Sequence, residues 1–271
     1  GDVYKRQEKY LLIYPFGNSD LAFNGEETFP RESYRDFRAH LETLNSLIRR
    51  GEAWVRPLTP AGEAFPCGLD FTRAPRELRK TSRKQEEFIV ETLCFPILVD
   101  VLHELLEKVS PGHYQRPAEV HIQPIVTDQS PPHPQDTLLV VPLVRVFTQL
   151  INQHWQAAGA RLRIRAREPW VLKGPVSHYD CLLRPYEEFY ERIRPELRTF
   201  ERIYFSLTTG TPAMSFAAGS VFAVDSRITF IYKPRGARRL VPVEVFRDRV
   251  RRQTLDRLRT LLDRFDFRGA L

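Results

Sequence analysis

The stretch from Arg202 to Val224 constrains the fold of this 271-residue chain more than any other. It begins with an apolar and aromatic run, Ile203 to Leu207, that is typical of a buried strand. A polar turn, 208–212, follows, and the chain resumes as a helix of small and apolar residues, 213–224. Strand, turn and helix in succession form the repeating unit of α/β folds, so we predict a mainly parallel sheet covered by helices.

The turn in this stretch, Thr208-Thr-Gly-Thr-Pro212, has the composition of an anion-binding site. Gly210 lets the backbone approach a ligand closely, and Pro212 suits the first turn of a helix, where its missing N–H would be unpaired in any case. The free N–H groups of the helix and the positive end of its dipole then face the turn. The turn is neither a P-loop, because no Gly-Lys-Ser/Thr follows, nor a G-x-G-x-x-G dinucleotide motif.

Two further strands end in polar turns. The apolar strand 10–14 leads into Pro15-Phe-Gly-Asn-Ser-Asp20, and the strand 119–126 leads into the turn 127–136. We expect Asp136 to cap a helix over 137–157. Because ligands of open α/β sheets bind at the carboxyl ends of the strands, the turns 15–20, 127–136 and 206–214 should gather at one edge. Each of them, taken alone, is also compatible with an ordinary strand-to-helix turn.

The other elements complete a Rossmann-like three-layer sandwich. Four arginines alternate with apolar residues over 161–167, which favours a solvated edge strand over a polyanion site. A C-terminal β-hairpin and a helical insertion after the first strand, 26–115, are added to the sandwich. The predicted elements are a helix over 31–50, an irregular segment over 51–81, a long helix from Ser82 with a kink at Pro96, a helix with Pro185 near its start, hairpin strands over 227–233 and 240–246, and a last helix over 247–265.

Net charge, cysteine content and the length of apolar runs indicate the kind of partner and the location of the protein. The chain carries 41 Lys and Arg against 34 Asp and Glu, a net charge of +7, which favours an anionic partner. Its three cysteines are far apart and have no metal-ligand spacing, so we predict no metal, no cofactor and a reducing, cytoplasmic location. No apolar run approaches about 18 residues, so no membrane-spanning segment is predicted.

The two ends of the chain carry separate predictions. Residues 1–7 lack an initiator Met and fit no element, so we interpret them as a cloning scar or an assembly artefact. Residues 8–246 are predicted to form the ligand-binding domain. Residues 247–271 are predicted to be a helix that leads to an effector domain beyond Leu271.

Two of the motifs together resemble the CARF (CRISPR-associated Rossmann fold) domain. They are the first strand with Pro15-Phe-Gly-Asn-Ser-Asp20 and the late strand with Thr208-Thr-Gly-Thr-Pro-Ala-Met214. The turn Thr127-Asp-Gln129 and the closing stretch 261–267 are also similar to accessory sensors of type III CRISPR systems. The resemblance covers roughly residues 8 to 267, and the segment 26–115 has no counterpart in the minimal core of the family.

The resemblance implies a homodimer that binds a cyclic tetra- or hexa-adenylate across its twofold axis and switches on a C-terminal effector, usually a nuclease. No nuclease or protease signature is present in the chain. Hydroxyl and backbone donors suit phosphates and ribose, and amide or carboxylate groups suit adenine edges. The predicted ligand-binding residues are Phe16, Gly17, Asn18, Ser19, Asp20, Asp128, Gln129, Ser206, Thr208, Thr209, Gly210, Thr211, Pro212, Met214 and Lys233.

Two alternatives to a sensor remain open at this point. Some relatives cleave their ring without a metal, by attack of a 2′-OH on the neighbouring phosphate, and Ser19, Thr209 and Lys173 are the candidate participants. The histidines His121, His133 and His178 could act as bases, although a structural or surface role is favoured for each. The other alternative is a DNA-binding regulator that uses the arginine-rich last helix.

Overall fold

A seven-stranded sheet forms the centre of the computed structural model, which describes residues 8–17, 20, 22–23, 42, 54–56, 92–109, 118–157, 161–234 and 239–263. Its strands are β1 (Glu8–Pro15), β5 (Ala118–Thr127), β6 (Leu162–Ala166), β7 (Trp170–Leu172), β8 (Arg202–Ser206), β9 (Ile228–Tyr232) and β10 (Val241–Pro242). The order is β10-β9-β8-β1-β5-β6, and β7 also pairs with β5. Every neighbouring pair is parallel except β9 and β10.

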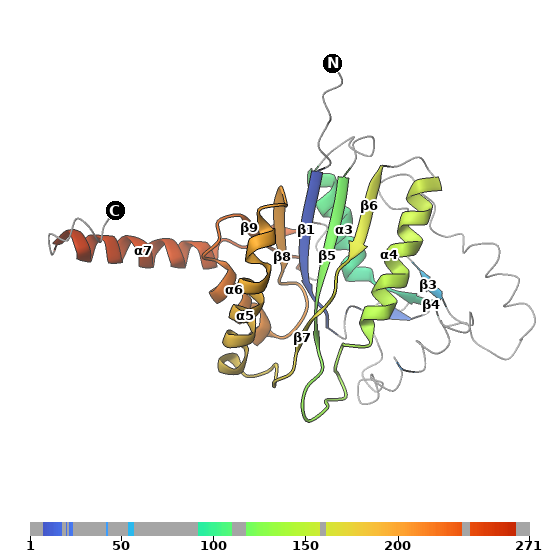
Figure 1. Cartoon of the computed structure of the whole chain (residues 1–271), viewed down its shortest axis with the longest axis horizontal. Coiled ribbons are helices and arrows are strands. Elements are labelled where there is room, and N and C mark those ends of the chain that lie inside the picture. Colours follow the sequence, from blue (N-terminus) through green and yellow to red (C-terminus); the bar gives the residue numbers. More distant parts are fainter. Residues whose placement is uncertain are drawn as a thin grey trace, which may run out of the picture.

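Helices cover both faces of this sheet, and the alternation of side chains along β1 shows how (Figure 1). Tyr10, Leu12 and Tyr14 belong to a core shared with α3 (Pro96–Val109) and α4 (Val140–Ala157). Leu11 and Ile13 point to the opposite face, into a core shared with α5 (Tyr179–Leu197) and α6 (Pro212–Phe222). A central strand buried on both faces therefore makes the three-layer, Rossmann-like sandwich that the sequence predicted.

The predicted helix from Ser82 with a kink at Pro96 is wrong where the structure describes it. A short strand, β4 (Thr92–Cys94), precedes Phe95, and Pro96 is the first residue of α3. Proline is tolerated there because the first N–H groups of a helix have no intrahelical acceptor. The start of the predicted helix, 82–91, lies outside the described residues.

The segment after β1 is not purely helical. β2 (Ala22–Phe23), β3 (Trp54–Arg56) and β4 form a separate three-stranded sheet in the order β2-β4-β3. Leu98, Val99, Val101 and Leu102 of α3 are fully buried in the core of the sandwich, so the end of the predicted insertion 26–115 belongs to the α/β frame. Most of 31–50 and 51–81 lies outside the described residues.

Two helices begin elsewhere than predicted. α4 begins at Val140 because Thr137 is held by Thr127: the Thr137 N–H donates to the Thr127 carbonyl, and the Thr127 N–H donates to the Thr137 hydroxyl, both at 3.0 Å. α5 begins at Tyr179, so Pro185 lies inside the helix and not near its start.

The C-terminal hairpin is present but short. β9 and β10 pair antiparallel, as predicted, yet β10 ends at Pro242, which has no N–H to continue the ladder. The last helix, α7 (Val245–Asp263), takes over residues 245 and 246 from the predicted strand and projects away from the sandwich (Figure 1). β6 lies at the other edge of the sheet, which confirms the edge-strand interpretation of its arginines.

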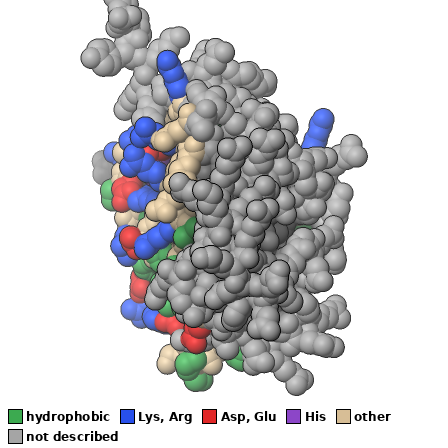
Figure 2. All heavy atoms as spheres, turned by 90° about the vertical axis from the view of Figure 1, so that its right-hand side faces the viewer, with side chains coloured by type: hydrophobic (Ala, Val, Ile, Leu, Met, Phe, Trp, Pro, Cys, Tyr) green, Lys and Arg blue, Asp and Glu red, His purple; other side chains and the backbone are tan. Residues whose placement is uncertain are grey.

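Charges of both signs share the surface of the described residues. On the face drawn in Figure 2, Lys and Arg side chains are interspersed with Asp and Glu. Of the edge-strand arginines, Arg165 pairs with Glu119 and Arg167 pairs with Glu196. None of the described helices is both long and apolar enough to cross a bilayer.

A Gly219→Ala substitution is expected to loosen the junction between α6 and α7. A Cβ at Gly219 would lie 2.3–2.4 Å from three atoms of the Phe246 ring, so the ring must shift. Overpacking of this kind typically costs about 1–3 kcal/mol, which urea unfolding would measure. Gly174→Ala is the matched control, because its Cβ would have no neighbour within 4 Å. Equal losses of unfolding free energy in the two variants would contradict the close packing of Gly219 against Phe246.

Candidate functional site

The polar turns after β1, β5 and β8 meet at the carboxyl edge of the sheet because these three strands are parallel neighbours. The Phe16 N–H donates to the Ile125 carbonyl at 2.8 Å and joins the first turn to β5. The Thr209 hydroxyl donates to the Pro15 carbonyl and joins the third turn to the first. Turns that are far apart in the sequence therefore form one surface.

The turn 208–212 is shaped by Gly210 and Thr211. Gly210 has a φ of +85°, in the left-handed region that favours glycine, and a Cβ there would lie 3.3 Å from the Pro15 Cβ. Thr211 is the N-cap of α6: its hydroxyl oxygen accepts from the Met214 N–H at 3.2 Å and donates to the Val176 carbonyl at 2.5 Å. The turn thus has one fixed conformation at the start of α6.

The N-terminus of α6 keeps donors free at this edge. Among the residues that the structure describes, the N–H groups of Thr209, Gly210 and Ala213 donate to no acceptor. Gly210 and Pro212 are exposed, so a ligand can approach the turn from solvent. The dipole of an 11-residue helix adds partial positive charge at the same place.

Beneath the turns lies a buried carboxyl group, Asp20. Its Oδ1 accepts from the Tyr14 hydroxyl at 2.5 Å, and its Oδ2 accepts from the Gly17 N–H at 2.7 Å. Burial raises the pKa of Asp20 to about 7, against the hydrogen bonds that lower it, and burial also raises the pKa of Tyr14. This network fixes the ends of the 15–20 turn, whose predicted ligand residues Asn18 and Ser19 lie outside the described part of the chain.

The turn after β5 is organised by Asp136, which is not the helix cap that the sequence predicted. Asp136 accepts from the Gln129 N–H and from the Gln129 side-chain amide, both at 3.1 Å, and from the His133 N–H at 2.9 Å. The Gln129 side-chain oxygen in turn accepts from the Val176 N–H at 3.4 Å. Val176 therefore bridges the second and third turns, a contact that the sequence pattern did not reveal.

The predicted ligand residues fall into two groups by exposure. Gly17, Asp128, Gln129, Thr208, Thr211 and Lys233 are partly exposed, and Gly210 and Pro212 are exposed. Phe16, Asp20, Ser206, Thr209 and Met214 are buried, with at most 4% of their surface exposed. The buried group supports the edge from below, whereas the other group lines its surface.

The lysines predicted for this site are held by carboxylates. Lys173 Nζ lies 2.5 Å from Asp128 Oδ2, and Lys233 Nζ lies 2.5 Å from Asp100 Oδ2. The Lys233 N–H also donates to the Thr208 hydroxyl at 3.0 Å, so the end of β9 belongs to the same edge. Each lysine therefore has a defined position there.

The three histidines considered as bases differ in position: His133 lies in the turn after β5 at this edge, His178 directly precedes α5, and His121 lies within a strand. His121 lies within β5 beside Glu119, at 3.0 Å, and burial lowers its pKa. His133 and His178 are exposed on loops. Within the described ranges, no three His, Cys, Asp or Glu side chains lie close enough to hold a metal ion.

A comparison with protein-family models and with curated proteins finds no match to this chain.

Proposed function

We propose that this chain is a homodimeric sensor domain that binds a cyclic oligoadenylate in type III CRISPR antiviral defence and thereby controls an effector. The observation that carries the proposal is the N-terminus of α6, where, within the described part of the chain, the N–H of the exposed Gly210 donates to no acceptor and the N–H groups of the buried Thr209 and Ala213 beside it are also unpaired. Backbone donors at a helix N-terminus bind phosphate well, because the donors and the dipole act together.

The neighbouring turn supplies groups for the rest of such a ligand. Asp128 and Gln129 are partly exposed after β5, the strand next to β1 in the sheet. Their carboxylate and amide groups can hydrogen-bond ribose hydroxyls or adenine edges. Lys173, paired with Asp128, adds a cation whose side chain is 67% exposed.

A twofold-symmetric ring is best bound by a twofold-symmetric site. One carboxyl edge offers a single α6 N-terminus, so it can bind phosphates on one side of a ring. A second copy of the chain, related by a twofold axis, would present the same donors to the opposite side. The proposal therefore requires that two chains share one ring.

Replacement of Thr209 by Ala is expected to weaken ring binding by at least about tenfold, because the turn loses its anchor to the Pro15 carbonyl and the free N–H groups lose their positions. Calorimetry with cyclic tetra- and hexa-adenylate measures the loss. Thr199→Ala is the matched control: its hydroxyl also donates to a backbone carbonyl, that of Glu196, at 2.8 Å, but just before the amino end of β8. No binding of either ring to the unmodified protein would rule out the proposal.

A further inference from the structure

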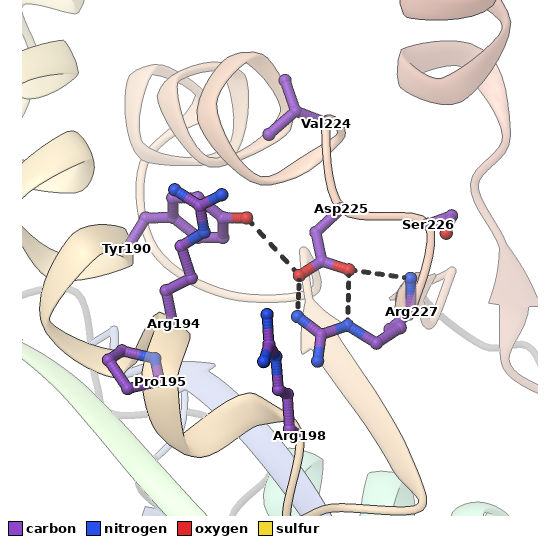
Figure 3. A pocket seen from close by; sticks show the side chains of 8 residues that line it. All are labelled: Tyr190, Arg194, Pro195, Arg198, Val224, Asp225, Ser226 and Arg227. Atoms are coloured by element: carbon purple, nitrogen blue, oxygen red, sulfur yellow. Dashed lines mark hydrogen bonds and ion pairs between the residues drawn. The ribbon is translucent and has the colours of Figure 1, made fainter.

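A pocket of about 780 Å³ opens at the amino edge of the sheet, opposite the site described above. It lies between the end of α5, the end of α6 and the start of β9 (Figure 3). The lining residues are Tyr190, Arg194, Pro195, Arg198, Val224, Asp225, Ser226 and Arg227. None of them belongs to the turns that the sequence analysis identified.

One carboxylate in this pocket is fully engaged by its neighbours. Arg227 donates from Nε to Asp225 Oδ1 at 2.9 Å and from Nη2 to Oδ2 at 2.5 Å, in a bidentate pair. The Arg227 N–H adds a bond to Oδ1 at 3.0 Å, and the Tyr190 hydroxyl adds one to Oδ2 at 3.4 Å. The hydrogen bonds from Arg227 lower the pKa of Asp225, so this carboxylate stays ionised at neutral pH.

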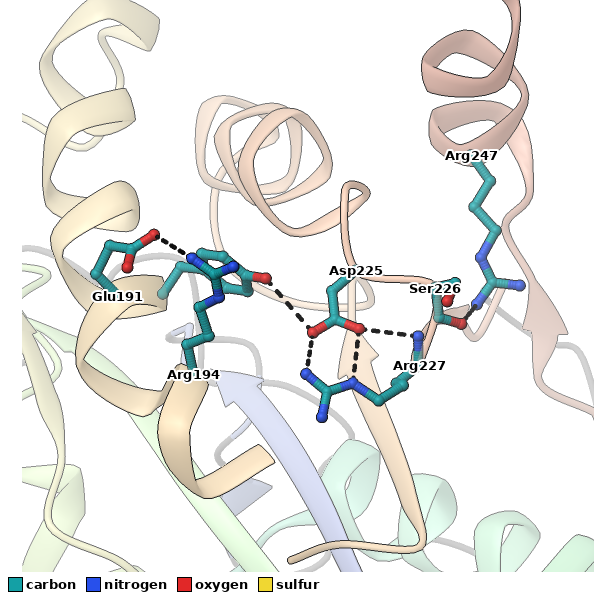
Figure 4. A network of polar contacts seen from close by, with 7 residues as sticks. Glu191, Arg194, Asp225, Ser226, Arg227 and Arg247 are labelled. Carbon is teal, nitrogen blue, oxygen red and sulfur yellow. Dashed lines mark hydrogen bonds and ion pairs between the residues drawn. The ribbon is translucent and has the colours of Figure 1, made fainter. Parts of the chain in front are cut away.

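The pocket nevertheless keeps an excess of positive charge. Its lining holds three arginines and one aspartate, and Arg194 also pairs with Glu191 at 3.4 Å, just outside the lining (Figure 4), so the local formal charge is +1. Arg198 has no acidic partner among the described residues, and Figure 3 shows its side chain reaching between Arg194 and the Asp225–Arg227 pair. The dipole of α5 favours cations at its C-terminal end, both Arg194 in the last turn and Arg198 at the C-cap, so this end of the helix brings two guanidinium groups to the pocket.

The loop that forms the far wall is fixed in place by a fourth arginine. Arg247 of α7 donates to the carbonyl of Ser226 at 2.9 Å (Figure 4) and to that of Ile228 at 2.7 Å. Val224 on this loop is 62% exposed, and it lines the pocket together with Pro195. The pocket therefore combines a cluster of guanidinium groups with an apolar surface.

We propose that this pocket binds the terminal phosphate group of a nucleotide. A phosphate monoester is an anion near neutral pH, and guanidinium groups such as that of Arg198 bind its oxygens in a fork geometry. The volume falls within the range of small-molecule sites, and Val224 and Pro195 offer apolar contact to the nucleoside. A free nucleotide and the 5′-phosphorylated end of a nucleic acid share this chemistry.

Calorimetry with AMP and with adenosine tests this site. We expect AMP to bind at least about tenfold more tightly than adenosine, and Arg198→Gln to weaken AMP binding by at least about tenfold. Arg184→Gln is the control, because Arg184 lies on the same helix, 86% exposed and paired with Glu188 at 2.9 Å, outside the pocket. The Thr209→Ala variant, altered at the other edge, should retain AMP binding.

The same titrations with oligonucleotides separate the two sources of the phosphate. Tighter binding of a 5′-phosphorylated strand than of AMP, lost with a 5′-hydroxyl strand and in Arg198→Gln, identifies a nucleic-acid end. Tighter binding of AMP identifies a free nucleotide. Equal affinities for AMP and adenosine, no binding at millimolar AMP, or an unchanged affinity in Arg198→Gln would each overturn the proposal.

Discussion

Raising the pH from about 4 to about 7 is expected to remove on the order of 4 kcal/mol from the free energy of unfolding through Asp20 alone. Burial raises the pKa of Asp20 from 3.8 to about 7 in the folded protein. Between these two values the folded state keeps a proton that the unfolded state has lost, so stability falls as the pH rises. Above about pH 7 both states are ionised and the contribution becomes constant.

The Asp20→Asn variant isolates this contribution from that of other titrating groups. The amide oxygen of Asn can accept from the Gly17 N–H, and its NH₂ group can donate to the Tyr14 hydroxyl oxygen, so the two contacts are retained without a titrating charge. Urea unfolding of both proteins across pH 4 to 8 measures the difference. If the free energy of unfolding of the two proteins changed with pH in the same way, Asp20 would not be the source of the pH dependence.

Phe222→Ala is expected to cost about 3–5 kcal/mol of unfolding free energy, because it empties the centre of an aromatic cluster. Phe222 is fully buried at the end of α6. Its ring centroid lies 5.1–6.3 Å from those of four other aromatic residues, namely Tyr186, Phe189, Tyr190 and Phe205. The cluster joins α5 and α6 to β8, so the substitution would leave a cavity where these three elements pack together.

The matched control for Phe222 lies on the same helix. Phe216 is 40% exposed and contacts Tyr179 at 5.3 Å between centroids, so Phe216→Ala should cost about 1 kcal/mol or less. Denaturant unfolding of both variants gives the comparison. Similar losses for the two phenylalanines would mean that the cluster does not hold this side of the sandwich together.

The sandwich was predictable because its signals are local. Short, fully apolar runs such as residues 10–14 are typical of central strands, and a glycine between a strand and a helix of small residues marks the turn at 210. The same signals place three turns at one edge, since parallel strands end together.

Contacts between distant residues could not be read in this way. Pro96 is the first residue of α3, because the short strand β4 and Phe95 come directly before it. Asp136 accepts hydrogen bonds from the backbone and the side chain of Gln129 and therefore does not cap α4. The arginine pocket joins residues from α5, the end of α6 and the start of β9, whose proximity depends on packing alone. Arg194 and Arg198 have helical spacing, but nothing in the sequence points to Arg227.

The stoichiometry of ring binding tests the central proposal most directly. Calorimetry with cyclic tetra- and hexa-adenylate, combined with sedimentation of the complex, gives both the number of rings and the number of chains. A shared site between two copies predicts one ring per two chains and a dimer in the complex. One ring per chain on a monomer, or no heat with either ring, would contradict the account.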